Sequence, residues 1–207
     1  MAKITIFDYG AGNIFSLKSA LERNGAENVE ITYELKELPK YDGLILPGVG
    51  NFDPAIRSIM SSAKHLGKAI DCGMPVMGIC LGMEMLFNRS EEGKLEGLKI
   101  LDGDVVMLPK NKVKIPHMGW NNLKIKNGDS KLLKGIKDDA WVYFVHSYHA
   151  VPKDHRIVVA TSDYGVSVPA VLEKSNLIGV QFHPEKSGDV GSIMIKNFIE
   201  LCNEAKK

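Results

Sequence analysis

Cys80 is the residue whose sequence context most clearly predicts chemistry. It lies between two glycines in the run Gly78-Ile79-Cys80-Leu81-Gly82, where an apolar strand passes into a predicted helix. Flanking glycines permit a tight strand-to-helix turn, and such a turn lifts its central side chain above the sheet. The start of the helix adds unpaired N–H groups and a positive dipole end, which favour a thiolate. The pattern predicts a nucleophilic thiol that is presented and not buried.

A thiol needs a base, because its ordinary pKa of about 8.5 leaves it mostly protonated near neutral pH. His183 follows the apolar run 177–182, which predicts a buried strand. Catalytic groups of open α/β sheets gather at the carboxyl ends of strands. Pro184 keeps His183 extended, and residues two apart in an extended chain point the same way, so Glu185 can orient the imidazole. We predict a catalytic triad of Cys80, His183 and Glu185.

Each of these residues alone would have a plainer explanation. A single cysteine is usually a small buried hydrophobic residue, and a single histidine at a strand end is usually structural. The combination of elbow glycines, strand context and the two-residue spacing from histidine to glutamate favours catalysis.

A glycine-rich turn at residues 47–50 follows another apolar strand and precedes another predicted helix. Such a turn exposes backbone N–H groups. If its strand lies next to the strand that ends at Cys80, the amide of Val49 or Gly50 joins the amide of Leu81 in an oxyanion hole. Without that neighbour, the turn is a simple connection from strand to helix.

Residues 116–121 and 143–149 concentrate histidine and aromatic side chains, so a metal site must be considered. The spacing argues against one. His146 and His149 would point to opposite faces of a strand, and no cysteine or carboxylate lies at a ligand-like interval. Aromatic residues with polar groups suit partly wet surfaces, which favours an interface or a pocket wall here. We predict no metal and no cofactor.

The whole chain of 207 residues, with 26 basic and 25 acidic side chains, predicts a single domain over residues 1–207. The net charge of +1 gives no sign of nucleic-acid or membrane binding. The N-terminal apolar run is too short for a signal peptide, and no apolar stretch of 18 residues exists. Three widely spaced cysteines then predict a cytoplasmic protein without a disulfide framework.

The first half of the chain alternates strand and helix patterns, which predicts a parallel sheet with helices on both faces. The expected strands there are 4–8, 29–33, 44–46 and 76–79, and the expected helices are 13–24 and 53–69. The second half has strand candidates with little helix between them, at 105–108, 141–145, 157–161, 168–172 and 177–182. We expect a mixed sheet with antiparallel additions, packed by a final helix over 190–206.

These segments together resemble class I (triad-type) glutamine amidotransferases, and among them the glutaminase subunits of imidazole glycerol phosphate synthases. The resemblance covers nearly the whole chain. It is carried by the motifs at 8–13, 47–50, 78–83, 116–121, 143–148 and 181–188. The elbow and triad mark only the superfamily, whereas the segments around Trp120 and His146, with 186–188, narrow it to this subunit. The fold so implied is a three-layer, flavodoxin-like α/β fold with a mostly parallel central sheet.

The resemblance implies hydrolysis of L-glutamine to glutamate and ammonia. It also implies a separate cyclase subunit with a (β/α)8 barrel, forming a heterodimer, because 207 residues cannot hold this domain and a barrel of about 250 residues. The cyclase would use the ammonia to convert PRFAR into imidazole glycerol phosphate and AICAR in L-histidine biosynthesis. By position in the family motifs, the oxyanion role falls on Val49, glutamine contacts on Gly50, Ser147 and Tyr148, and partner contacts on Asn13 and Trp120.

One residue departs from the family pattern: Glu84 stands where the family usually has glutamine, at a position that contacts the substrate. An ionised glutamate accepts hydrogen bonds but cannot donate them. Two outcomes stay open, pairing with the substrate ammonium or repulsion of its α-carboxylate with a raised KM. We expect a working glutaminase with an altered affinity for glutamine.

Two other functions compete with this interpretation. A paralogous glutaminase that supplies ammonia to an amidotransferase of bacterial surface sugars would share the same motifs, and only its partner would distinguish it. A regulatory or binding subunit with an inactive glutaminase site is the second alternative. The intact set Cys80, His183 and Glu185 argues against it.

Overall fold

The computed structural model describes residues 2–10 and 14–205. Its α-helices are α1 (Ile14–Arg23), α2 (Phe52–Met60), α3 (Ala63–Asp71), α4 (Leu81–Glu84) and α5 (Gly188–Ala205), with 3-10 helices η1 (Leu35–Lys40), η2 (His155–Ile157) and η3 (Pro184–Lys186). Its strands are β1 (Lys3–Phe7), β2 (Asn28–Thr32), β3 (Gly43–Leu46), β4 (Val76–Ile79), β5 (Gly103–Met107), β6 (His117–Asn122), β7 (Lys124–Ile125), β8 (Trp141–His146), β9 (Tyr148–Pro152), β10 (Val158–Asp163), β11 (Ser167–Lys174) and β12 (Leu177–Val180).

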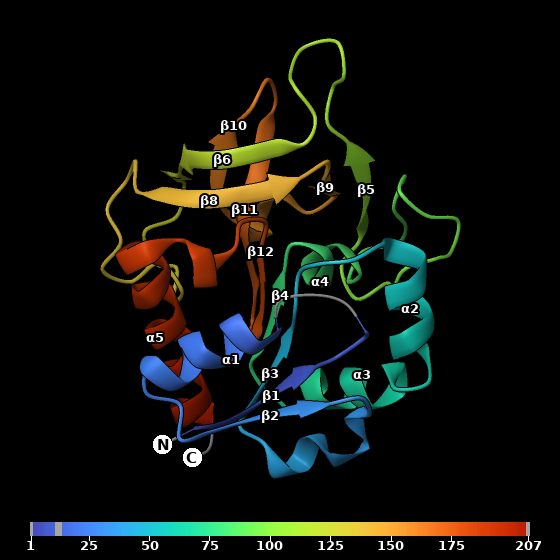
Figure 1. Ribbon diagram of the computed structural model, residues 1–207, viewed down its shortest axis with the longest axis vertical. Coiled ribbons are helices and arrows are strands. Elements are labelled where there is room, and N and C mark those ends of the chain that lie inside the picture. The colour runs from blue at the N-terminus through green and yellow to red at the C-terminus, as the bar shows by residue number, and fades with distance from the viewer. Residues whose placement is uncertain (1, 11–13, 206–207) are drawn as a thin grey trace.

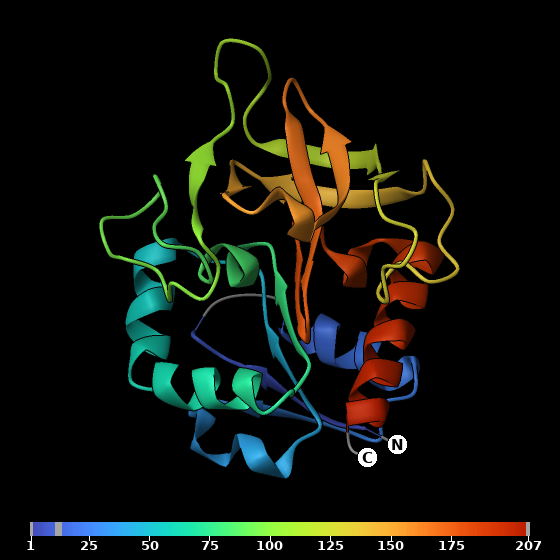
Figure 2. The ribbon, with the colours of Figure 1, turned by 180° about the vertical axis from the view of Figure 1, so that it is seen from behind.

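The main sheet has eight strands in the order β2-β1-β3-β4-β12-β11-β10-β7. The five strands from β2 to β12 run parallel, and β11, β10 and β7 add to them in antiparallel fashion. The predicted mixed, mostly parallel sheet is therefore confirmed. In Figure 2 the orange strands β10 and β11 extend beyond the parallel part, toward the short sheet formed by β6 and β8.

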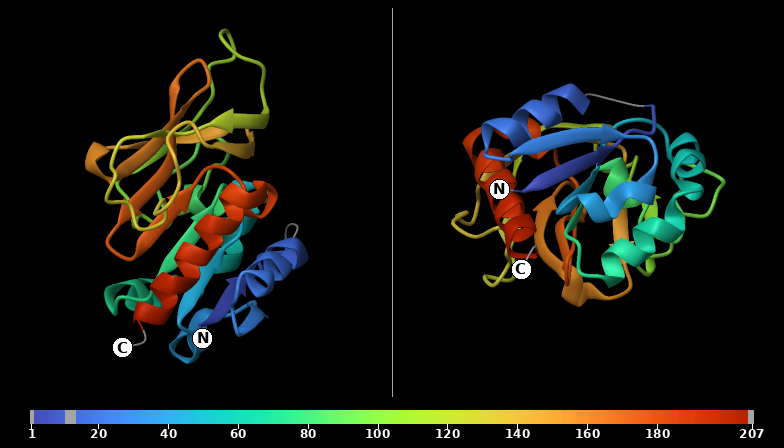
Figure 3. Two further views of the ribbon diagram at one scale, coloured as in Figure 1. Left: turned by 90° about the vertical axis from the view of Figure 1, so that its left-hand side faces the viewer. Right: turned by 90° about the horizontal axis from the view of Figure 1, so that it is seen from below.

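Alternating side chains of the parallel strands feed two separate cores. Ile4 and Ile6 of β1 and Ile45 of β3 pack on the side of α1 and α5, whereas Leu44 and Leu46 of β3 pack on the side of η1, α2 and α3. A strand that is buried on both faces needs apolar residues at every position, which the runs in β3 and β4 provide. Helices accordingly cover both faces, giving the predicted three layers (Figures 1 and 3).

The predicted helix 53–69 was wrong in one respect, because the structure divides it into α2 and α3. The division lies at Ser61 and Ser62. The buried hydroxyl of Ser62 accepts a hydrogen bond from the N–H of Leu35 at 3.2 Å, and its carbonyl accepts the first N–H groups of α3. The Ser62 side chain thus holds the start of η1 at the division and does not cap α3.

Three strands of the second half were not predicted, namely β6, β7 and β9. Strand β6 pairs with β8, and β9 pairs with β5, so both make small antiparallel sheets beside the main one. The final helix was predicted within two residues of α5 at its start. None of the helices in the described part of the chain is long and apolar enough to cross a membrane.

Candidate active site

Cys80 occupies the turn between β4 and α4, with φ of 47° and ψ of −108°. This backbone conformation is rare for a residue with a side chain, and such strain is concentrated at functional sites. The neighbouring glycines are required by close packing. A Cβ on Gly78 would lie 2.7 Å from the N atom of Met83, and one on Gly82 would overlap the carbonyl of Leu46. The tight turn predicted from the sequence is present.

The expectation that the thiol is exposed was wrong, since Cys80 is only 6% accessible to solvent. Two segments close over it. The turn after β3 places Gly48 so that a Cβ there would come within 3.0 Å of the Cβ of Cys80, and the end of β8 brings the Val145 carbonyl to 3.8 Å from Sγ. The sulfur is therefore enclosed by the turn after β3 and the end of β8.

The sequence predicts a stabilised thiolate, but in the structure burial and a nearby carboxyl act more strongly against it. Burial raises the pKa of the Cys80 thiol well above its usual value, and the nearby carboxyl of Glu84 raises that pKa further. The N–H of Leu81 and the side-chain amide of Gln181 act in the opposite direction. Helix α4 is a single turn, so its dipole is small, and one N–H group cannot compensate for burial.

His183 and Glu185 form the hydrogen-bonded pair that the sequence predicts. The Nδ1 atom of His183 lies 2.9 Å from Oε1 of Glu185, and both side chains are buried. The pairing arises partly from a feature that was not expected. His183 itself is extended, but Glu185 belongs to the 3-10 turn η3, which starts with Pro184. The Nε2 atom of His183 has no partner among the described residues, so it is available for proton transfer.

The order of the strands brings this pair and Cys80 to the same edge of the sheet. Strand β12 is the parallel neighbour of β4, with Val180 opposite Ile79, and the N–H of Cys80 donates to the Val180 carbonyl at 2.7 Å. His183 comes three residues after Val180. The Glu185 carboxyl is close enough to Cys80 to raise the pKa of the thiol.

The glycine-rich turn at residues 47–50 lies directly beside the elbow. Strand β3 pairs with β4, with Leu46 opposite Gly78, so the condition set for an oxyanion hole is met. Val49 is half-buried, whereas Gly50 is exposed and has a φ of +124° that favours glycine. The N–H of Leu81 points at the sulfur of Cys80.

The segment that joins β8 to β9 contributes the other side of the site. Ser147 and Tyr148 follow the Val145 carbonyl that contacts the sulfur, and both are half-buried. Tyr148 lies near Glu84, whose charge raises the pKa of the tyrosine, although burial is the larger cause. The structure therefore places residues 80–84 beside the His183–Glu185 pair, and Ser147 and Tyr148 follow the strand end that contacts the sulfur.

Two residues of this region were missed in the sequence. Gln181 lies with its Nε2 atom 3.6 Å from Sγ of Cys80 and 3.2 Å from Oε1 of Glu84, and it is fully buried. A glutamine within the otherwise apolar run 177–182 was the available signal. Tyr9 follows β1 and buries a hydroxyl that has no partner among the described residues. Cys80 and Glu84 both raise its pKa, after the larger effect of burial.

An exposed aromatic surface adjoins the site on the outer face of β6 and β8. Trp120 is 51% exposed, packs edge-on against Tyr143 at 6.0 Å between ring centroids, and lies near Gly188. Lys186 places its Nζ atom 5.9 Å from the centre of the Tyr143 ring. Asn13, the other predicted partner contact, lies outside the described residues.

This surface is tied to the histidine by backbone hydrogen bonds. The N–H of His183 donates to the Tyr143 carbonyl at 2.9 Å. Ser187 completes the link, since its hydroxyl donates to the His183 carbonyl at 2.7 Å and accepts from the Tyr143 N–H at 3.0 Å. Strand β8 and the turn that carries His183 are thus held as one unit.

The histidines of the β6–β8 sheet form a structural cluster. His117 Nδ1 lies 2.9 Å from His146 Nε2, and the His117 ring stacks on Tyr164 at 3.8 Å between centroids. Burial lowers the pKa of His117 to about 4 and that of His146 to about 3, so both rings are neutral near pH 7. Across the described ranges, no group of three metal-ligating side chains comes together.

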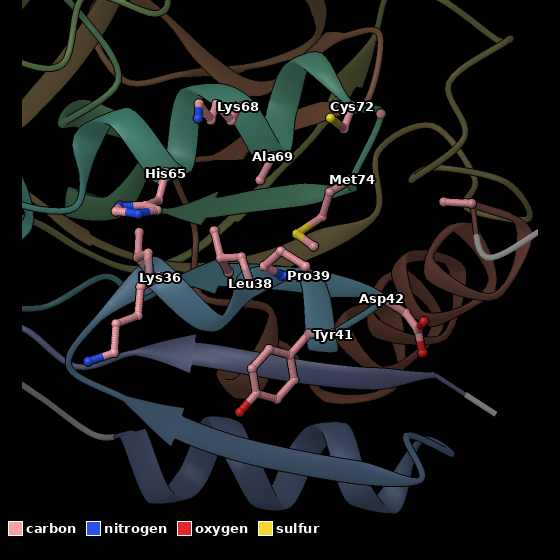
Figure 4. Close-up of a pocket in the computed structure, with 13 residues that line it drawn as sticks. Lys36, Leu38, Pro39, Tyr41, Asp42, His65, Lys68, Ala69, Cys72 and Met74 are labelled. Atoms are coloured by element: carbon pink, nitrogen blue, oxygen red, sulfur yellow. The ribbon is translucent and has the colours of Figure 1, made fainter.

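A separate cavity of about 400 Å³ lies at the opposite ends of the parallel strands, between η1, α3 and the turn before β4. Figure 4 shows residues that line it, among them Leu38, Pro39 and Met74, with Lys36 and His65 to one side. None of the residues predicted to act on a substrate lines this cavity. We therefore place the candidate active site at Cys80 and not here.

Comparison with known proteins matches residues 5–201 to the family model for class I glutamine amidotransferases. The chain belongs to this family. It is 48% identical over 201 residues to "Imidazole glycerol phosphate synthase subunit HisH" of Caldanaerobacter subterraneus subsp. tengcongensis, covering 96% of this chain and 98% of that protein. The protein of the same name from Methanosarcina acetivorans is 44% identical over 205 residues, with 98% and 100% coverage.

Solved structures show the same fold at lower identity. PurLQS from Thermotoga maritima matches with a TM-score of 0.76 and 21% identity, covering 100% of both chains. The glutaminase domain of Trypanosoma brucei CTPS, solved with bound acivicin, matches with a TM-score of 0.75 and 18% identity, covering 99% of this chain and 94% of that one. Membership of the class I glutamine amidotransferase family makes this chain an enzyme, and the two solved structures share its fold. The predicted family is confirmed.

Proposed function

We propose that this chain is the glutaminase subunit of an imidazole glycerol phosphate synthase and that Cys80, His183 and Glu185 carry out the hydrolysis of L-glutamine. One observation carries the proposal. A cysteine in a strained elbow lies beside a strand that ends in a hydrogen-bonded His–Glu pair, in a chain whose relatives carry that name at 43–48% identity.

The reaction follows from the arrangement of these groups. The Cys80 thiolate attacks the side-chain amide carbon of glutamine, the C–N bond breaks, and His183 Nε2 passes the proton from the thiol to the departing ammonia. Water, deprotonated by the same nitrogen, then attacks the thioester and releases glutamate and the thiol. Glu185 holds Nδ1, so that the free nitrogen keeps its orientation toward the reacting atoms.

The negative charge on the carbonyl oxygen during both steps requires donors. The N–H of Leu81 is adjacent to the sulfur, and the N–H of Val49 lies on the turn packed against the elbow. We assign them the oxyanion role. Gly50, Ser147 and Tyr148 border the same region and are assigned to binding glutamine. Glu84, which the sequence also predicts as a glutamine contact, is only 4% exposed and bonds to Gln181 instead.

The ammonia goes to a cyclase subunit, in our proposal a (β/α)8 barrel that forms a heterodimer with this chain. The surface around Trp120 and Tyr143 suits such a partner, because large aromatic side chains with a neighbouring cation are typical centres of protein interfaces. Its hydrogen-bonded link to His183 means that the partner would rest directly on the element that carries the base.

Replacing Trp120 with alanine should weaken the affinity for the cyclase subunit by roughly 30-fold or more, the effect of removing an aromatic interface anchor of about 2 kcal/mol. Isothermal titration calorimetry of the two subunits measures it. Met60→Ala is the matched control, because Met60 is 49% exposed at the end of α2, away from this surface. Equal affinities for both variants would exclude Trp120 from the interface.

Glutamate release from L-glutamine tests the function itself. The purified chain is assayed alone, with the cyclase subunit of the same organism, and with that subunit plus PRFAR. We expect strong stimulation by partner and PRFAR together. Absence of turnover in all three conditions by the folded protein would contradict the proposal, and turnover only with an acceptor subunit of surface-sugar synthesis would assign the paralogous function.

A further inference from the structure

Glu84 places a carboxyl group deep behind the thiol of Cys80. It is 4% exposed and ends the single turn α4, where its N–H donates to the Cys80 carbonyl at 3.0 Å. Its Oε1 atom accepts a hydrogen bond from Nε2 of Gln181 at 3.2 Å, and the same nitrogen lies 3.6 Å from the sulfur. One buried amide group therefore connects the carboxyl of Glu84 to the thiol.

The groups that face Glu84 from the surrounding elements are all acidic or neutral. They are Cys80 at the elbow, Tyr9 after β1, Glu92 in the loop after α4 and Tyr148 of β9. No cation in the described part of the chain acts on the carboxyl. A buried carboxylate without a positive partner is strongly unfavourable, so the group takes up a proton instead.

The electrostatics agree with this geometry. Burial, with a smaller contribution from Glu92, raises the pKa of Glu84 to about 8, although the hydrogen bond from Gln181 opposes the shift. Glu84 is thus neutral near pH 7 and becomes ionised as the pH rises through about 8. Once ionised, its charge raises the pKa of the Cys80 thiol and so disfavours the thiolate.

We propose that Glu84 works as a protonated carboxyl, a positioning residue that holds Gln181 beneath Cys80 and keeps a second negative charge away from the thiolate. The proposal rests on the proposed function, because it requires Cys80 to be the nucleophile. In its neutral form a glutamate offers one acceptor oxygen and one O–H donor, much as the side chain of glutamine offers an acceptor and a donor. The site thereby gains an alkaline limit that a glutamine would not impose.

The test compares the wild type with Glu84→Gln, which keeps a carbonyl acceptor for Gln181 but cannot ionise. For glutamine hydrolysis in the complex with cyclase and PRFAR, the ratio of the wild-type kcat/KM to that of Glu84→Gln should fall about tenfold between pH 7 and 9, as expected for one group with a pKa of about 8. Ionisation of the Cys80 thiol affects both proteins and therefore largely cancels in this ratio. An alkaline decline of the same size and midpoint in the variant would overturn the proposal.

A second measurement does not depend on turnover. The infrared difference spectrum between the wild-type chain and Glu84→Gln should contain the carbonyl band of a protonated carboxyl at pH 6.5, and this band should disappear above pH 9. A carboxylate band at pH 6.5 would overturn the inference even in a fully active enzyme. A protonated carboxyl in a chain that never hydrolyses glutamine would contradict the proposed function. It would leave the inferred protonation of Glu84 standing.

Glu84→Ala separates the positioning role from simple packing. This variant removes the acceptor for the buried amide of Gln181, so kcat/KM should drop about tenfold at every pH, without the alkaline decline. At pH 7 we expect Glu84→Gln to keep the kcat/KM of the wild type, whereas Glu84→Ala should not. Equal activity of both variants would overturn the role assigned to the hydrogen bond with Gln181.

Discussion

Replacing Cys80 with alanine should reduce glutamine-dependent synthesis by the complex by roughly 10⁴-fold or more, which is the usual effect of losing a covalent nucleophile. The remaining His183–Glu185 pair then has no thiol to deprotonate. Synthesis driven by added ammonium salt should persist, because in our proposal the cyclase subunit needs only ammonia. Both rates are measured on the same complex by following product formation with each nitrogen source.

The matched control is Cys72→Ala. Cys72 is an exposed free cysteine that lines the cavity at the opposite ends of the strands, so both rates should equal those of the wild type. If Cys80→Ala abolished the ammonia-dependent rate as well, Cys80 would have a structural role in the complex and not a catalytic one. If it left glutamine-dependent synthesis intact, the nucleophile would be a different residue.

The sequence allowed the fold and the elbow to be predicted because the relevant signals are local. Apolar runs bounded by glycine and proline identify the parallel strands, and the glycines around Cys80 describe a turn whose geometry only they permit. The His183–Glu185 contact was also predictable from a spacing of two residues, although the actual turn is a 3-10 helix and not an extended chain. The contact forms in either conformation, because two residues this close in the chain stay within reach of each other.

The burial of the thiol could not be predicted in the same way. It depends on Val145 and Gly48, which lie 65 and 32 positions from Cys80 and reach it only through the order of the strands. The cluster behind the thiol has the same origin, since Tyr9, Glu84 and Gln181 come after three different strands, β1, β4 and β12. The pKa of a group follows from such long-range neighbours, so a thiol expected to ionise easily has a raised pKa in the folded chain.

The strands of the small sheets were missed because their patterns are weak. Residues 117–122 contain a glycine and two asparagines, which are depleted in strands and common in turns. Their strand conformation comes from pairing with β8 along six residues, a tertiary contact. The interface or pocket-wall role predicted for this segment stays a prediction, and Trp120 is exposed as that role requires.

Gly82→Ala should be the most damaging single substitution for the stability of the elbow, lowering the free energy of unfolding by about 3 kcal/mol. A Cβ at this position would overlap the Leu46 carbonyl and come within 2.9 Å of the Pro47 carbonyl oxygen, and both are backbone atoms that cannot rotate away. Relief requires β3 or the elbow to move, so glutamine hydrolysis should also be lost. Urea denaturation followed by circular dichroism measures the first effect, and glutamate release measures the second.

Gly67→Ala is the control that isolates the steric cause. Gly67 lies within α3, and a Cβ there would meet no atom within 4 Å, so the added methyl group should stabilise the chain by about 0.5 to 1 kcal/mol through its helix propensity. Both variants add the same atoms to the same residue type, and only their surroundings differ. Equal effects on unfolding would mean that the elbow can relax, and the close contact between Gly82 and β3 would then not be what holds Cys80 in its strained conformation.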